Sequence, residues 1–211
     1  MGIFNMNTQE IFTSFYENVI ATKWQEWTST IFQIASVWYA KKNNILVYPT
    51  GIIGVLLAAY VYFYLSSPPL YADCILNLYY LGMSIYGWYN WTKKKNETVT
   101  FPISWCGEDE WRLGILLGIV SWGIIYWMLI QLTDSNTPGM DSLVAASALT
   151  SMYWMAKRKI ENWIGWVFSN MVAIPLNFYK GFMLFTLMYI LFLGLAISGY
   201  QSWKKEIIKT N

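Results

Sequence analysis

One stretch of the sequence carries polar and aromatic side chains at helical spacing inside an apolar run. In residues 74–92, Asn77, Tyr80, Ser84 and Trp88 follow Asp73 at steps of three or four, which places them on one face of an α-helix. Amide side chains pair with hydroxyl and carboxamide groups, and aromatic rings stack on flat rings. This face predicts a binding surface for a small ligand with hydroxyls, an amide and a flat ring, although its polarity would equally suit a sugar.

A second stretch, residues 162–179, repeats the pattern. Trp163, Trp166, Asn170 and Asn177 share one helical face, and Gln131 ends another apolar run. An Asn inside an apolar helix can instead hydrogen-bond a neighbouring helix. We favour a ligand role for Asn170, because it lies near the middle of its run beside two Trp residues.

Other aromatic residues and prolines have different expected roles. Trp residues at the ends of apolar runs are typical of the membrane interface, and we expect this role for Trp91, Trp105, Trp111 and Trp203. A proline in a helix frees a carbonyl and permits a bend. Tyr48, Pro49 and Pro175 are therefore candidates for a gate or hinge.

The composition indicates an integral membrane protein. Of 211 residues, 56% are hydrophobic and 12% are charged, against about 25% charged in soluble domains. The mean hydropathy is +0.34. A spanning helix needs about 20 apolar residues. Seven helices are predicted, at residues 24–40, 45–72, 74–92, 113–132, 142–156, 162–179 and 181–203.

The basic residues give the orientation. Twelve of the 14 fall in alternate loops and in the tail after residue 203, and only Lys23 and Lys180 fall on the other side. Because basic loops stay in the cytoplasm, we expect the N-terminus outside and the C-terminus inside. The predicted location is the bacterial inner (cytoplasmic) membrane, in a multi-pass arrangement.

An internal repeat predicts the architecture. Residues 87–93 resemble residues 199–205, and residues 38–42 resemble 154–158, at offsets of 112 and 116. The fold class we expect is all-α: two parallel three-helix bundles, residues 24–92 and 141–203, joined by a loop and linker helix in residues 93–140. Residues 1–23 form an extracytoplasmic segment and 204–211 a cytoplasmic tail. Paired repeats of this kind occur in transporters.

Composition also excludes functions. The chain has no His and two Cys, so it lacks the usual ligands of a metal site and the residues of a His-based catalytic centre. It has no P-loop sequence, and its net charge of +2 gives no reason to expect nucleic acid. No charged residue lies mid-span, which favours uncoupled transport over ion-driven transport. We expect no enzyme activity and no cofactor.

Five motifs, in order along the chain, resemble the bacterial nicotinamide riboside transporters of the PnuC family. They lie at residues 48–52, 70–73, 86–88, 159–166 and 179–181. The resemblance implies a full-length relative of the SWEET transporters that passes nicotinamide riboside, a vitamin B3 precursor of NAD, down its gradient. It also implies trapping by a cytoplasmic riboside kinase, and a homo-oligomer is compatible with it.

The family's Trp-x-x-Trp and Asn-x-x-Tyr patterns correspond here to Trp163 with Trp166 and to Asn77 with Tyr80, although Trp88 with Trp91 also fits the first. The alternatives are an uncoupled carrier of thiamine, riboflavin or a sugar. A substrate-binding subunit of an ATP-driven importer and a membrane-embedded enzyme are further from the pattern.

Overall fold

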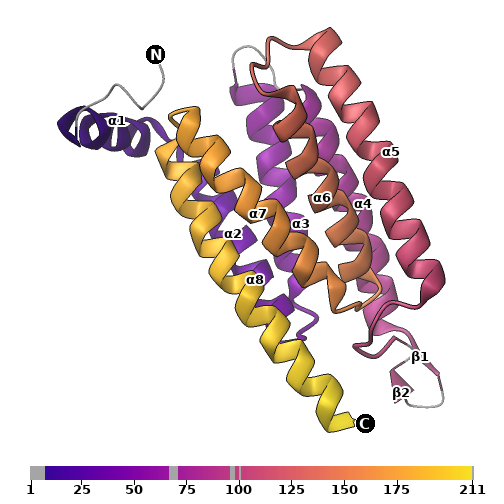
Figure 1. Cartoon of the computed structure of the whole chain (residues 1–211). Coiled ribbons are helices and arrows are strands. Elements are labelled where there is room, and N and C mark those ends of the chain that lie inside the picture. Colours follow the sequence, from indigo (N-terminus) through magenta and orange to yellow (C-terminus); the bar gives the residue numbers. More distant parts are fainter. Residues whose placement is uncertain (1–7, 67–70, 96–97, 100, 211) are drawn as a thin grey trace.

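The protein is almost entirely helical. The computed structural model describes residues 8–66, 71–95, 98–99 and 101–210 (Figure 1). Its elements are α1 (Thr8–Ala21), α2 (Trp24–Lys41), α3 (Val47–Tyr60) with a π-helical turn η2 (Val61–Leu65), α4 (Tyr71–Thr92), β1 (Lys94–Lys95), β2 (Thr98–Val99), α5 (Glu108–Leu132), α6 (Pro138–Ala156), α7 (Glu161–Tyr179) and α8 (Met183–Thr210).

A helix is present in each of the seven predicted ranges, with three differences. The predicted 45–72 helix ends in η2 at Leu65, and residues 67–70 lie outside the described part. Helix α8 continues beyond the predicted span to Thr210, so the predicted tail is helical over its described residues 204–210. The loop after α4 forms a hairpin in which β1 pairs antiparallel with β2, an exception to the all-α expectation.

The first helix was not predicted as an element of its own. Thr8–Ala21 is helical, and in Figure 1 it projects to the side of the bundle near the end opposite the C-terminus. Thr22 ends it by donating its hydroxyl to the Asn18 carbonyl at 2.7 Å. The apolar residues of this segment are too interrupted by polar ones to suggest a membrane span of its own.

The helices form two successive sets. Helices α2, α3 and α4 (the first half) pack in chain order, and α6, α7 and α8 (the second half) do the same. The halves meet where α4 packs on α6 and where α8 packs on α2. In each contact, the last helix of one half packs on the first helix of the other. Helix α5 lies on the outside along α6 (Figure 1).

Equivalent local contacts recur between the halves. A Cβ on Gly51 would press on the Ser36 hydroxyl, and a Cβ on Gly165 would press on the Ser151 hydroxyl. These pairs are related by offsets of 114 and 115 residues. The turns that follow α2 and α6 also match, because Asn43 (φ 51°) and Arg158 (φ 54°) are both left-handed.

Length and apolarity mark three of the described helices as able to cross a membrane. They are Val47–Leu65, Glu108–Leu132 and Met183–Lys209.

Two loops are bonded to each other at one end of the molecule. In the loop between α4 and α5, Ser104 N donates to the Arg158 carbonyl of the loop between α6 and α7, and Ile160 N donates back to the Ser104 carbonyl. We call the end that carries these loops and the C-terminus the basic end.

Candidate functional site

Four aromatic rings fill the space between the helices at the basic end. We call Tyr48, Trp91, Trp163 and Trp203 the aromatic tetrad; their exposed fractions are 1%, 4%, 0% and 0%. Neighbouring ring centroids are 5.1 Å apart for Tyr48–Trp91, 5.9 Å for Trp91–Trp203 and 5.5 Å for Trp163–Trp203. Each ring comes from a different helix (α3, α4, α7 and α8), so the tetrad closes this end against water.

Two glycines make room for the tetrad. A Cβ at Gly87 would collide with the Tyr48 ring, and a Cβ at Gly199 would collide with the Trp163 ring. Gly87 on α4 and Gly199 on α8 are 112 residues apart, and Tyr48 and Trp163 are 115 apart. The same glycine–ring contact therefore occurs once in each half.

The other two rings are held by hydrogen bonds between the halves. Trp203 Nε1 donates to the Ala40 carbonyl at 2.9 Å, and Trp91 Nε1 donates to the Met155 carbonyl at 3.2 Å. The acceptors lie at the equivalent C-terminal ends of α2 and α6, and each also accepts one N–H of the following turn, from Asn43 at Ala40 and from Arg158 at Met155. The Arg158 guanidinium also lies over the Trp91 ring, 4.2 Å from its centroid.

Toward the opposite end, tyrosines rather than tryptophans face one another. Tyr62 of η2, Tyr80 of α4 and Tyr189 of α8 are close enough to interact electrostatically with one another and with Asp73, and we call the three the tyrosine cluster. At 1.5 Å per residue, Tyr189 lies about 9 Å into α8 and Tyr80 about 13 Å into α4. Since α4 and α8 are not among the helix pairs with extensive packing, Tyr80 and Tyr189 approach each other from different halves of the molecule.

Two buried amides lie on α4 and α7. Asn77 is buried, and its Nδ2 donates to the Asp73 carbonyl at 2.8 Å, while its Oδ1 accepts no hydrogen bond from a described residue. Asn170 is 4% exposed, and within the described residues its side chain makes no hydrogen bond. The amide atoms of Asn170 are not among the fully buried unpaired atoms of the described residues, so they stay accessible to a ligand. Ser84 is also buried, and it lies about one helical turn beyond Tyr80 along α4.

Three predicted residues take other places. Trp88 is 40% exposed, because the predicted face of α4 is wider than the surface that the neighbouring helices cover. Gln131 is exposed at the end of α5, whose one extensive helix contact in the described structure is with α6, so it does not join the others. Trp163 belongs to the tetrad, where other rings cover it completely.

The remaining predicted residues lie as follows. Trp166 is half-buried and packs against the tetrad region. Asn177 Nδ2 is engaged with the Ala173 carbonyl at 2.8 Å. Pro49 lies in the first turn of α3, where it breaks no helical hydrogen bond. Pro175 lies inside α7, on an exposed face.

The expectation of an interfacial role was wrong for two tryptophans. Trp91 and Trp203 are buried in the tetrad, whereas Trp105 and Trp111 are exposed as expected. The sequence did contain a signal: a glycine precedes each by four residues, which is one helical turn. Tyr62 and Tyr189 carried no comparable signal, since single tyrosines in apolar runs have no pattern of their own.

Charges at the end opposite the basic end are partly neutralised. Lys180 Nζ lies 2.5 Å from the Asp141 carboxylate, which also accepts hydrogen bonds from Ser135 and Thr137. Asp73 has no salt bridge within the described residues. At the basic end, the Glu161 carboxylate accepts the Cys106 N–H at 2.9 Å. Burial, followed by the contact with Glu161, raises the pKa of the Cys106 thiol.

Known proteins resemble this chain over nearly all of its length. The family described as "Nicotinamide mononucleotide transporter" matches residues 23–205. The nicotinamide riboside transporter PnuC of Escherichia coli (strain K12) is 23% identical, with 85% of this chain and 84% of that protein covered. The riboflavin/roseoflavin transporter RibM of Streptomyces davaonensis is 20% identical, over 94% of this chain and 92% of that protein.

A solved structure has the same fold. The structure described as "Crystal structure of the Vitamin B3 transporter PnuC" superposes with a TM-score of 0.69 at 22% sequence identity, covering 95% of this chain and 89% of that one. A likeness at this identity concerns the arrangement of the helices. The aromatic tetrad and the tyrosine cluster are described from this chain alone.

Proposed function

We propose that this chain, which belongs to the nicotinamide mononucleotide transporter family, carries nicotinamide riboside across the membrane by facilitated diffusion. The family match over residues 23–205 is the observation that carries the proposal. The chain is a multi-pass membrane transporter and not an enzyme. The substrate named for two of its relatives, in Escherichia coli and in Neisseria mucosa, is nicotinamide riboside.

The chemistry of the site suits this substrate. Nicotinamide riboside has a pyridinium ring, a carboxamide and a ribose. The ring would stack within the tyrosine cluster, where aromatic faces attract a cation by about 0.5–2 kcal/mol. The free oxygen of Asn77 and the unpaired amide of Asn170 would hydrogen-bond the carboxamide and ribose. Trp166, Ser84 and Asn177 would complete the walls.

Transport would proceed by alternating access between two bundles. The first bundle (residues 24–92) and the second (141–203) would rock about their contacts, with α5 as the linker helix. The matched contacts at offsets of 112–115 residues support this division. The aromatic tetrad, which includes Tyr48, would be the cytoplasmic gate. With seven helices crossing, the N-terminus would lie outside and the C-terminus inside, as the basic loops indicate.

Two consequences belong to the same proposal. Uncoupled transport only equalises concentrations, so net uptake requires a cytoplasmic riboside kinase to trap the substrate. The membrane would be the bacterial inner membrane.

Riboflavin is the second candidate substrate, because RibM covers nearly the whole chain. The two candidates differ in size and charge: the ring system of riboflavin is neutral and three rings wide. A site between four helices that is lined by single tyrosines favours the smaller ring.

Competition binding separates the candidates. The purified chain is titrated with labelled nicotinamide riboside in detergent, with unlabelled nicotinamide riboside, riboflavin and thiamine as competitors. We expect displacement by the unlabelled riboside at micromolar concentration and by neither of the others. Displacement by riboflavin at lower concentration than by the riboside would assign the chain to riboflavin.

A further inference from the structure

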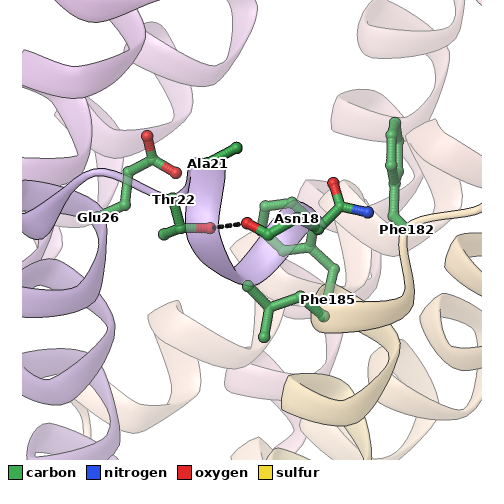
Figure 2. Close-up of a pocket in the computed structure, with 7 residues that line it drawn as sticks. Asn18, Ala21, Thr22, Glu26, Phe182 and Phe185 are labelled. Atoms are coloured by element: carbon green, nitrogen blue, oxygen red, sulfur yellow. Dashed lines mark hydrogen bonds between the residues drawn. The ribbon is translucent and has the colours of Figure 1, made fainter. Parts of the chain in front are cut away.

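A small pocket lies outside the central site, at the end opposite the tetrad. It occupies about 190 Å³ and is lined by Asn18, Ala21, Thr22, Glu26, Phe182, Leu184 and Phe185 (Figure 2). It forms where the turn between α1 and α2 meets the start of α8. An apolar cavity of about 150 Å³ can hold a benzene molecule, so this pocket has room for one six-membered ring.

The pocket offers aromatic faces to its contents. Phe182 and Phe185 contact each other edge to face, with centroids 6.1 Å apart and ring planes at 75°. Both rings are about half-exposed. The faces of aromatic rings carry negative potential and attract cations.

The pocket also contains an unneutralised carboxylate. Glu26 forms no salt bridge within the described residues, although Lys23 lies three positions before it. The Lys23 ammonium group is instead bonded to the Leu65 carbonyl at 2.9 Å. One carboxylate beside two aromatic rings is a combination that selects a flat cation over a neutral or anionic molecule.

The pocket is connected to the central site electrostatically. Glu26 acts on Tyr62, and Tyr62 in turn acts on Tyr80. Helix α2, which carries Glu26, packs along α3, and the η2 turn that follows α3 carries Tyr62.

We propose that this pocket is an outer vestibule that holds a flat organic cation before it moves to the tyrosine cluster. The proposal rests on the proposed function, in which the pyridinium ring of the substrate is that cation. The cationic headgroup of a lipid has related chemistry and is the other source of a ligand for the pocket.

The kinetic test compares E26Q with E17Q in proteoliposomes of phosphatidylglycerol, which has no cationic headgroup. Glu17 is an exposed acid on α1 outside the pocket, so E17Q is the matched control. We expect E26Q to raise the KM for nicotinamide riboside about fivefold with kcat unchanged. This factor corresponds to the ~1 kcal/mol attraction of unit charges about 4 Å apart in water. E17Q should stay within twofold of the wild type.

Added salt should raise the KM of the wild type more than that of E26Q, because salt screens an exposed charge. An E26Q KM within twofold of the wild type would overturn the vestibule. Phosphatidylcholine in place of phosphatidylglycerol distinguishes the lipid source. If choline lipid inhibits the wild type and E26Q merely removes that inhibition, the pocket is a lipid site and the vestibule is overturned.

A binding measurement keeps the test independent of transport. Labelled N-methylpyridinium, a flat cation, should bind the wild type with a strong and a weak component, and E26Q should lose the weak one. Neutral nicotinamide should show no weak component. A weak component that survives in E26Q contradicts the vestibule, whereas a wild type that moves no nicotinamide riboside contradicts the proposed function.

Discussion

The two ends of the helix bundle are built from different aromatic residues. At the basic end, the tetrad rings are buried, pack within 6 Å of one another, and are fixed by glycines and by indole hydrogen bonds. Toward the other end, three tyrosines interact electrostatically with one another, and a pocket with one carboxylate in its lining lies where α1 and α2 meet the start of α8. The difference indicates that one end is closed by packing while the other keeps polar groups available.

Replacing Asn170 should have the strongest effect, a loss of affinity for nicotinamide riboside. Asn170→Leu keeps the side-chain volume and removes a buried amide that has no partner in the described structure. Loss of two ligand hydrogen bonds, each about 1–1.5 kcal/mol, should weaken binding of nicotinamide riboside about 100-fold. Titration calorimetry measures this change.

The fold should not suffer, since the variant replaces an unsatisfied polar group. Gln201→Leu, at an exposed amide on α8, is the matched control and should bind normally. Unchanged affinity in Asn170→Leu would remove Asn170 from the site.

The packed end should respond in stability instead. Gly199→Ala places a methyl group against the Trp163 ring, and overpacking of this kind costs about 1–3 kcal/mol. Thermal unfolding in detergent should therefore show a lowered Tm. Gly194→Ala on the same helix, which has open space around the new Cβ, is the control. Equal Tm values for the two variants would show that the tetrad is loosely packed.

A smaller effect is expected from one indole hydrogen bond. Trp203→Phe removes the indole donor to the Ala40 carbonyl, which keeps the Asn43 N–H, and should destabilise the closed tetrad by about 1 kcal/mol. The gate should then open more often, which is measurable as faster labelling of a cysteine that replaces the buried and similarly sized Ser84. Trp127→Phe, at an exposed ring on α5, should leave the labelling rate unchanged. A rate unaffected by Trp203→Phe would argue against the gate.

The smallest effect concerns the loop that covers the basic end. Burial and Glu161 raise the pKa of the Cys106 thiol, and the thiolate is the reactive form. Maleimide labelling of Cys106 at pH 8, in a Cys74→Ser background, should therefore be slow and should speed up several-fold as the pH rises further. Glu161→Gln should raise the rate at pH 8. Rapid labelling of the parent protein would show that this loop is detached.

The sequence was sufficient for the helices and insufficient for the depth of individual rings. Apolar runs between charged residues located seven helices, because each run must be long enough to bury its backbone. The repeat was visible because Gly and Trp recur at an offset of 112. What separates Trp91 in the tetrad from Trp105 on the surface is the neighbouring helix, and a single helix does not contain that information.

The same limit applies to the site. Helical spacing placed Asn77, Tyr80 and Ser84 on one face, and the structure leaves that face partly buried. Helical spacing gave no reason to include Tyr189, because this residue comes from a helix more than 100 residues further along the chain. Gln131 lies apart from the other site residues. Among the described helices, α5 packs extensively on α6 alone, and the sequence of α5 does not show which of its sides that contact covers.

Uptake by the isolated protein shows whether the chain is an uncoupled carrier of nicotinamide riboside. Proteoliposomes that contain this chain, with no ion gradient, are given labelled nicotinamide riboside outside. We expect uptake that stops when the internal and external concentrations are equal. In Asn170→Leu, half-maximal uptake should need a substrate concentration about 100-fold higher. Accumulation above the external concentration only in the presence of a sodium or proton gradient would contradict an uncoupled carrier.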